Sequence, residues 1–248
     1  MKDSAQRVLM LGLFAANSAF AAADIPEGWS TSVEFGAIAT SGNTVGASVT
    51  GKVDARQELD DWSNQFVISG FFKEDEVSSD EGDKVRVRSA QQYLMSAKAA
   101  LHMKDKNKKL FILATHADDR FGVFSTYSSL SLGCSSRVFK SARQSLDVDV
   151  GPGYFAGVRA NGEADSGLIA HGSAALEWKI GPSAVFTEVV SVERGTANMR
   201  STAEAALRTK ISDTMQMKAA FSARTDTGIS DEKKSTDSQT SLTFVYAF

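Results

Sequence analysis

Alternation of apolar and polar side chains with a period of two runs through most of this chain, and it constrains the fold more than any other feature. From residue 45 to residue 55 the odd positions hold Val, Ala and Gly, whereas the even positions hold Gly, Ser, Thr, Lys and Asp. The final segment repeats the pattern, with Leu242, Phe244, Tyr246 and Phe248 on one parity. Because successive side chains of a strand point to opposite faces, each such segment predicts a strand with one apolar face and one polar face.

Segments of this kind predict about twelve strands along the chain. Most are longer than the roughly 5 to 6 residues that are usual in soluble sheets, and most exceed the roughly 9 to 11 residues that cross a bilayer at a tilt. An even number of long strands with one apolar face is typical of an outer-membrane barrel. We therefore expect an all-β chain that forms a closed antiparallel transmembrane β-barrel, with strands over residues 29–40, 44–59, 62–73, 84–103, 109–121, 126–139, 144–155, 165–180, 184–193, 199–211, 215–225 and 236–248.

Composition agrees with a strand-rich chain and excludes some classes of function. The chain has 19 glycines and only 3 prolines, and 42% of its residues are hydrophobic. A formal net charge of -3 excludes a nucleic-acid binder that is driven by positive charge. Cys134 is the single cysteine, so no internal disulfide holds the fold. We expect closed backbone pairing to hold it instead.

Residues 1–23 have the features of a secretory signal peptide. Lys2 and Arg7 flank an apolar run over residues 8–16, and small residues follow at 21–23. The run is too short to cross a bilayer as a helix. We expect cleavage after Ala21 or Ala23, which leaves residues 24–248 as a single barrel domain in the bacterial outer membrane.

The predicted connections alternate in length along the chain. The short ones lie at 60–61, 104–108, 140–143, 181–183 and 212–214. The longer ones lie at 74–83, 156–164 and 227–235. Outer-membrane barrels have short periplasmic turns and longer extracellular loops, so we expect both termini on the periplasmic side.

The three tryptophans support this topology. Trp29 opens the first predicted strand, Trp62 opens the third and Trp178 closes the eighth. In an up-and-down barrel these three positions lie at the same end. Since indole rings prefer the membrane interface, we predict that the tryptophans form a periplasmic aromatic belt.

The last strand carries an aromatic ladder that a soluble domain would leave without cover. Lipid can cover Phe244, Tyr246 and Phe248, and pairing with the first strand removes both sheet edges. An aromatic C-terminal strand also resembles the assembly signal of outer-membrane barrels. This resemblance implies the barrel-assembly machinery and periplasmic chaperones as partners, and we expect outer-membrane lipids and lipopolysaccharide around the wall.

Several short motifs are spread over most of the chain after the signal peptide. They are Gly28-Trp29-Ser30, Ser41-Gly42-Asn43-Thr44, Asp118-Asp119-Arg120-Phe121, Val150-Gly151-Pro152-Gly153-Tyr154, the segment 207–213 and the ending 234–248. Together they resemble the YdiY-like family of salt-induced outer-membrane proteins, which has no assigned function, and the segments 74–83 and 194–198 match least well. The resemblance implies an outer-membrane barrel, and it brings no catalytic residues.

The polar parity of the predicted strands is rich in charges of both signs. Charges that lipid excludes must point inward whatever the protein does. The pattern is therefore compatible with an open pore for small solutes or ions and with an interior that salt bridges pack shut. The residues predicted to line the lumen are Lys52, Asp54, Arg56, Arg86, Arg88, Lys98, Arg137, Asp147, Asp149, Glu177, Arg200, Glu204, Arg208, Lys218 and Arg224.

The histidines raise a membrane-embedded lipid enzyme as a distant alternative. Outer-membrane phospholipases and acyltransferases use His with Ser, and His116 and Ser136 lie on neighbouring predicted strands. His171 follows Asp165 and Ser166. No third group orients either pair, so we predict no catalytic residue and no cofactor.

An acidic segment over residues 74–83 could attract divalent cations. Its spacing matches no calcium-loop pattern, and clusters of like charge resist ordering. We therefore predict a solvated loop without a metal site.

Two positions conflict with simple alternation. Pro152 lies inside a predicted strand between two glycines, which predicts a bulge near the strand's outer end or, alternatively, a kink that narrows the lumen. In the strand over 184–193, the apolar parity carries Glu188 into the lipid, whereas the opposite register exposes Glu193.

Three classes of function remain open after these observations. The first is a channel for small solutes or ions, and the second is a non-conducting structural barrel that acts under envelope stress. The third is the lipid enzyme. Substrate and oligomeric state are not determined by the sequence.

Overall fold

The structure is a computed structural model that describes residues 28–40, 45–78, 83–196, 198–227 and 236–248. The predicted signal peptide over residues 1–23 lies outside the described residues, as does the motif over 41–44. Among the residues that are described, no helix is long and apolar enough to cross a membrane.

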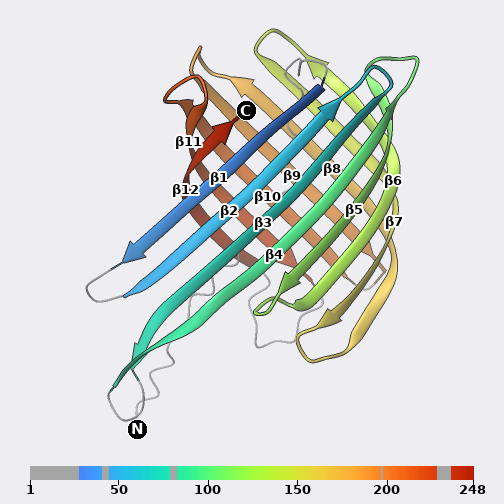
Figure 1. Ribbon diagram of the computed structural model, residues 1–248. Helices are drawn as coiled ribbons and strands as arrows, with labels where there is room; N and C mark the ends of the chain where they lie inside the picture. The colour runs from blue at the N-terminus through green and yellow to red at the C-terminus, as the bar shows by residue number, and fades with distance from the viewer. Residues whose placement is uncertain (1–27, 41–44, 79–82, 197, 228–235) are drawn as a thin grey trace.

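Twelve antiparallel strands close into one barrel in which each strand pairs with its neighbours in the sequence (Figure 1). This confirms the predicted fold class. Most predicted boundaries differ from the observed ones by a few residues. The strands are β1 (Gly28–Thr40), β2 (Gly46–Glu58), β3 (Trp62–Ser78), β4 (Lys84–His102), β5 (Lys108–Asp119), β6 (Phe124–Lys140), β7 (Gln144–Arg159), β8 (Ala164–Lys179), β9 (Ala184–Gly195), β10 (Met199–Lys210), β11 (Met215–Asp226) and β12 (Thr236–Ala247).

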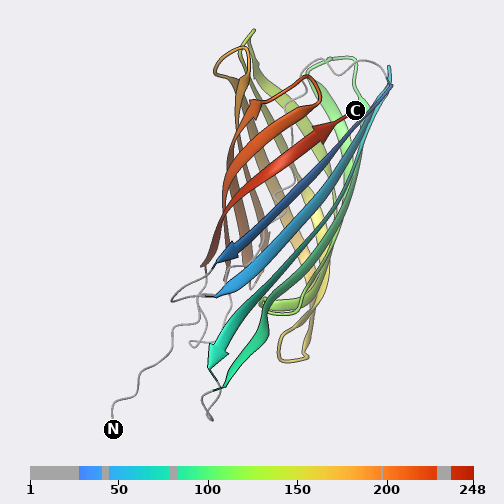
Figure 2. The same ribbon diagram turned by 60° about the vertical axis from the view of Figure 1, so that its left-hand side comes forward.

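Pairing between β1 and β12 closes the barrel, as expected from the aromatic last strand. Four residue pairs form this seam, from Ser32↔Ala247 to Phe35↔Phe244. Thr31 and Phe248 add two backbone hydrogen bonds of 2.9 Å at the C-terminus. Figure 2 shows the C-terminal strand beside β1 at this seam.

The outer wall is apolar, as the alternation predicts. Phe35, Ile68, Leu168 and Phe244 are each more than half exposed on it. A single-layered wall of this kind needs an apolar solvent, because every apolar side chain that faces water costs free energy in proportion to its area. The architecture is that of an outer-membrane barrel.

Polar side chains fill much of the interior. Contacts between strands that are not neighbours in the sheet identify the inward face, because they can form only across the lumen. Nζ of Lys109 on β5 lies 3.3 Å from Oε1 of Glu58 on β2, and Lys98 on β4 forms an ion pair with Asp149 on β7. The inward face therefore carries charges of both signs.

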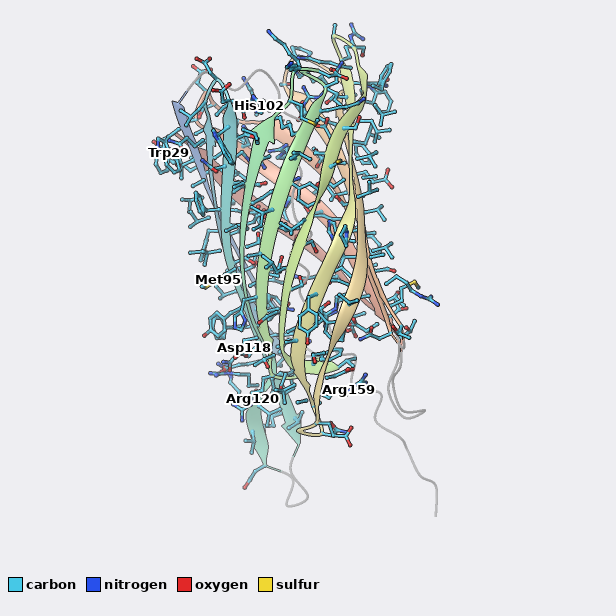
Figure 3. The ribbon with its side chains drawn as sticks, turned by 90° about the vertical axis from the view of Figure 1, so that its right-hand side faces the viewer. Trp29, Met95, His102, Asp118, Arg120 and Arg159 are labelled. Carbon is cyan, nitrogen blue, oxygen red and sulfur yellow. The ribbon has the colours of Figure 1, made fainter. Side chains whose placement is uncertain are left out.

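The two ends of the barrel differ in how far the strands extend. We call the end of the barrel that carries Trp29 the tryptophan end. The other end, at which β5 and β7 end, is called the far end. In Figure 3, Trp29 and His102 are labelled toward the tryptophan end, and Asp118 and Arg159 toward the far end. At the far end β3 continues to Ser78 and β7 to Arg159. Residues 74–78 and 156–159, which were assigned to the long connections at 74–83 and 156–164, therefore belong to strands.

Pro152 lies in the middle of β7, and no bulge forms there. The β6–β7 register is the same on both sides of it, with Ser131↔Gly153 and Cys134↔Val150. The prediction of a bulge near the strand's end is wrong. A Cβ atom on Gly133 or Gly151 would collide with a carbonyl oxygen of the opposite strand, so the glycines allow a close approach of β6 and β7 here.

Candidate functional site in the barrel lumen

Most residues that were predicted to line the lumen point inward in the structure. Their placement follows from the strand parity and from their contacts with other inward side chains. Their role in a channel stays a prediction. The inward residues of this set are Lys52, Asp54, Arg56, Lys98, Arg137, Asp147, Asp149, Glu177, Arg200, Glu204, Arg208, Lys218 and Arg224.

Arg86 and Arg88 are corrections to that set, because they lie on the outer side of the β3–β4 hairpin. The register shifts between Lys73 and Glu74, where Ser89 is left without an opposite residue. This bulge reverses the parity of residues 84–88, at the start of β4, relative to the remainder of the strand. The Arg88 guanidinium consequently lies 5.8 Å from the ring centroid of the outward Phe72, and both arginines are exposed.

An ion pair crosses the lumen near the far end. Nη2 of Arg224 on β11 lies 2.9 Å from Oδ2 of Asp119 on β5, and these two strands are opposite each other in the ring of twelve. Asp226 accepts from Arg200 at 2.7 Å and lies 3.1 Å from Nε of Arg224. Arg224 and Asp226 are 6% and 5% exposed. We call the Arg224–Asp119 contact the far-end bridge.

Beside the far-end bridge, aromatic side chains pack together on the inner side of β6 and β7. Phe124, Tyr127 and Phe155 are buried together with Ala117 and Ile169, and we call these five residues the aromatic cluster. The rings of Tyr127 and Phe155 stack with centroids 5.5 Å apart. Such packing excludes water from the space between these rings.

Polar groups connect the aromatic cluster to β9 and β10. The Arg200 guanidinium on β10 lies 3.8 Å from the ring centroid of Tyr127 on β6. The Tyr127 hydroxyl donates to Glu193 on β9 at 2.7 Å, and Ser129 donates to the other oxygen of Glu193 at 3.1 Å. The lumen is therefore crossed at this level by a cation–π contact and by hydrogen bonds.

Four charged side chains of alternating sign face the lumen farther from the far end. Glu34 and Lys52 are directly opposite each other on β1 and β2. Nζ of Lys218 lies 3.3 Å from Oε2 of Glu34 and 3.0 Å from Oε1 of Glu204. Thr243 stands between β11 and β1, and its hydroxyl donates to Glu34 at 2.7 Å. We call Glu34, Lys52, Glu204 and Lys218 the charged chamber.

Two cavities meet at the charged chamber, and all four of its residues line both. One cavity has a volume of about 20 Å³ and extends toward Ser32, Asp54 and Arg208. The other has a volume of about 30 Å³ and extends toward Ser222 and Gln239, next to the far-end bridge. Each cavity therefore has room for about one or two water molecules beside the charged side chains.

Ion pairs line the lumen toward the tryptophan end as well. Arg56 donates to both oxygens of Asp54 at 3.0 Å, and Nε of Arg137 donates to Asp147 at 2.8 Å. Glu177 is 6% exposed. The inner wall thus carries paired charges over most of its length.

The aromatic residues of the outer wall lie where the sequence predicts them. Trp29, Trp62 and Trp178 are 61%, 45% and 42% exposed. Each lies at or next to the end of its strand, at the tryptophan end of the barrel. Phe244, Tyr246 and Phe248 point outward on β12. Their roles as a periplasmic belt and as an assembly signal stay predictions.

Glu188 faces outward, in agreement with the apolar parity of β9. It is exposed and pairs with Leu176 and Ala205. Trp178 and Phe186 form the pair two residues closer to the tryptophan end. This position close to the aromatic interface lowers the cost of a carboxylate on the wall, because that cost falls with distance from the bilayer centre.

The histidines do not assemble the serine pairs considered from the sequence. Ser136 pairs with Lys108, near the opposite end of β5 from His116. His116 instead contacts Ser128 at 2.8 Å on the outer wall. His171 packs against Phe111 and lies 3.8 Å from Glu193. Within the described ranges, no group of three or more His, Cys, Asp or Glu residues could hold a metal ion.

Sequence reasoning missed the aromatic cluster and the far-end bridge. A signal for an apolar interior is present on β5, where the run 110–113 (Leu-Phe-Ile-Leu) is apolar on both parities. Leu110 and Ile112 are exposed on the outer wall, whereas Phe111 and Leu113 are buried inside. A strand that is apolar on both faces indicates cover on both sides.

Comparisons with known proteins agree with this architecture. A family model described as "Protein of unknown function, DUF481" matches residues 33–248, and a search of curated proteins finds no match. The COG4313 outer membrane channel from Pseudomonas putida F1 is similar with a TM-score of 0.55 at 10% identity, over 90% of this chain and 97% of that chain. The NanC porin is similar with a TM-score of 0.51 at 5% identity, over 88% and 98% of the two chains. At these identities the likeness shows the fold.

Proposed function

The chain belongs to the DUF481 family of proteins of unknown function, and we propose that it is an outer-membrane channel for small solutes and ions with a mixed-charge lumen. The observation that carries the proposal is the pair of cavities that meet at the charged chamber. These cavities leave space for water beside four charged side chains of the inner wall, as a path for small polar solutes requires.

The far-end bridge is the proposed closure of this path. Along β11 the inward residues run from Lys218 in the charged chamber through Ala220 and Ser222 beside a cavity to Arg224 in the bridge. Rotation of the Arg224 side chain away from Asp119 would remove the contact between opposite walls. The channel is then closed in this structure and opens by a side-chain rearrangement.

The outer wall supports the proposed orientation and surroundings. The tryptophan end faces the periplasm, and outer-membrane lipids with lipopolysaccharide contact the apolar wall. The barrel-assembly machinery and periplasmic chaperones act on the chain during biogenesis. The two similar solved structures are described as an outer membrane channel and a porin, which is compatible with conduction by this barrel.

A second candidate is a non-conducting barrel that supports the envelope, in line with the resemblance to salt-induced outer-membrane proteins. The aromatic cluster and the far-end bridge favour it, because together they fill the lumen at one level. Such a barrel would have a phenotype only in envelope integrity under salt or osmotic stress.

Recording the current through the refolded protein in a planar lipid bilayer under a salt gradient separates these candidates. A channel produces discrete conductance steps, and the reversal potential gives its preference for cations or anions. A folded barrel that passes no current at any applied voltage contradicts the channel and favours the structural barrel.

A further inference from the structure

The β3–β4 hairpin reverses the pattern of the outer wall at the far end. Beyond its bulge, Val77, Val85 and Val87 lie on the face that continues the inner wall. Arg86 and Arg88 lie on the outward face instead. A wall that meets hydrocarbon has the opposite arrangement, with apolar side chains outward. The outer side of this part of the hairpin therefore meets a polar layer.

An aromatic pair on the outer wall marks the edge of the hydrocarbon. The rings of Phe72 on β3 and Tyr93 on β4 meet edge to face with centroids 5.4 Å apart. Toward the tryptophan end, Ile68 and Met95 are opposite each other on the outer wall, and both are more than half exposed. Aromatic rings are enriched at the boundary between hydrocarbon and headgroups. Arg88, on the far-end side of the pair, is therefore at the level of the lipid headgroups.

Arg88 and Arg120 both lie beside Gln91. Nη1 of Arg88 donates to Oε1 of Gln91 at 2.9 Å. The backbone N–H of Arg120 donates to the carbonyl oxygen of Gln91 at 3.2 Å, so it extends the pairing of β5 with β4 by one residue. Arg120 has the outward parity of Asp118, which is opposite Tyr93, and Figure 3 labels both toward the far end. Two arginines of neighbouring strands thus lie next to one outward amide side chain.

The positive charge of these arginines is only partly balanced by other side chains. Nη2 of Arg88 is 3.8 Å from Oε1 of Glu74, and both side chains are 46% exposed. A pair with this exposure contributes little, because water screens it. Within the described ranges, no ion pair involves Arg86 or Arg120. Two arginines of the outward face can therefore donate to an anion from outside.

The outward face of this region has a small excess of positive charge. Its described residues provide four cationic and three anionic side chains, which are Lys84, Arg86, Arg88, Arg120, Glu74, Glu76 and Asp118. One positive charge is thus left without a carboxylate. An anion that binds several guanidinium groups together would balance it.

A phosphate monoester is the anion that fits two arginines. A guanidinium group donates two parallel N–H bonds to phosphate oxygens. A monoester carries about 1.5 to 2 negative charges at pH 7, so it can pair with two guanidinium groups at once. A lipid that bears this group also places its acyl chains against the apolar wall beside Tyr93 and Met95. In the outer leaflet of an outer membrane such a lipid is lipopolysaccharide, whose lipid A part carries phosphate on an acylated sugar.

We propose that Arg88 and Arg120 bind a phosphate group of lipid A on the outer wall, and that Arg86 extends this site away from the bilayer. We call these three residues the phosphate site. The inference rests on the proposed orientation, because that orientation places the far end in the leaflet that contains lipopolysaccharide. The bulge at Ser89 creates the site, since without it Arg86 and Arg88 would point to the lumen.

Native mass spectrometry of the refolded protein in detergent micelles tests the proposal with lipid A as the probe. The first control is lipid A from which the phosphates have been removed. It should bind at least about tenfold more weakly, since a lost hydrogen bond between charged groups costs that much or more. The second control is phosphatidylglycerol, which should also bind more weakly than lipid A, because its phosphodiester has a single negative charge.

Variants assign the bound lipid to the phosphate site. Arg88→Gln/Arg120→Gln should weaken lipid A binding at least about tenfold, and Arg120→Gln alone should give a smaller loss. Both side chains are exposed, so these variants should fold. The matched control is Arg194→Gln. Arg194 is also exposed on the outward parity at the far end, but it lies on β9, away from β4 in the ring of strands. This control should bind lipid A like the wild type.

Several outcomes would overturn the proposal. They are equal binding of lipid A and its dephosphorylated form, unchanged binding by the double variant, and an equal loss in Arg194→Gln. Equal binding of phosphatidylglycerol would make a phospholipid the occupant and would also overturn lipid A.

The binding measurement depends neither on current nor on the orientation of the barrel, so its failure can be distinguished from failure of the channel. A barrel that binds lipid A and passes no current would overturn the channel and keep the phosphate site. Labelling of Lys84→Cys, in a Cys134→Ser background, by a membrane-impermeant maleimide on intact cells tests the orientation. We expect labelling, because Lys84 would lie outside the cell. Labelling only after the outer membrane is permeabilised would place the far end in the periplasm and exclude lipopolysaccharide as the partner.

Discussion

The aromatic cluster and the charged chamber line the same lumen but occupy its space differently. Phe124, Tyr127 and Phe155 pack ring against ring near the far end. Glu34 and Lys218 and their neighbours are held by ion pairs that need specific geometry, and cavities remain beside them. Apolar packing has no directional requirement and fills space, whereas paired charges keep distances and leave gaps. The difference teaches that a barrel of twelve strands can hold a packed apolar cluster at one place in its lumen and paired charges with small cavities at another.

Truncation of Phe155 should have the largest effect on this comparison. Phe155→Ala should lower the free energy of unfolding by about 3 to 5 kcal/mol, because it leaves a cavity that the surrounding rings cannot fill. Urea titration of the protein in lipid vesicles measures the loss. Phe221→Ala is the matched control, since Phe221 is 52% exposed on the outer wall and lipid can close the gap. Equal losses at both positions would contradict a packed cluster inside the barrel.

Removal of one lumenal charge should have a smaller effect. Asp149 is 5% exposed, pairs with Lys98 and accepts from Ser173 at 3.3 Å. Asp149→Asn should cost about 2 kcal/mol, as expected for a hydrogen bond to a charged group. A double-mutant cycle with Lys98→Gln should show that the two changes are coupled. Additive losses would mean that the pair contributes nothing beyond its separate members.

Loss of the C-terminal residue should weaken the side of the barrel that holds the charged chamber. Deletion of Phe248 removes two backbone hydrogen bonds to Thr31 at the β1–β12 seam, and we expect a loss of about 1 to 2 kcal/mol. Urea titration and the yield of refolded barrel measure it. Tyr246→Phe serves as the control, because it keeps an aromatic ring on the same strand. An unchanged stability after the deletion would show that the seam does not depend on its last residue.

The smallest effect should come from an ion pair outside the lumen. Lys84 is 68% exposed and lies 2.9 Å from Glu76 on the β3–β4 hairpin. Glu76→Gln should change the free energy of unfolding by less than about 0.5 kcal/mol, because water screens exposed pairs. A loss as large as that of Asp149→Asn would erase the distinction between lumenal and external pairs.

The alternation of side chains made most of the fold predictable, because lipid on one side of the wall requires an apolar residue at every second position. Residues such as Lys52 and Lys218 could therefore be placed inside from parity alone. Arg86 and Arg88 were misplaced, because one extra residue at Ser89 reverses the parity and leaves no mark in the sequence pattern.

Contacts across the lumen could not be predicted in the same way. Asp119 and Arg224 are 105 residues apart in the sequence, and their meeting depends on the diameter and stagger of the closed barrel. The cluster around Phe155 depends on the same geometry. Parity assigns Phe155 and Tyr127 to the inside, but it does not reveal that their rings reach each other or that Arg200 on β10 covers the Tyr127 ring.

The most direct test of the account compares single-channel recordings of wild-type protein and Arg224→Gln in the same planar bilayers. Glutamine keeps a hydrogen-bonding side chain but cannot form the ion pair with Asp119 that spans the lumen. The account predicts that the variant spends a larger fraction of time open than the wild type. An equal open fraction in the two folded proteins, or no current through either, would contradict a path through the charged chamber that the far-end bridge closes.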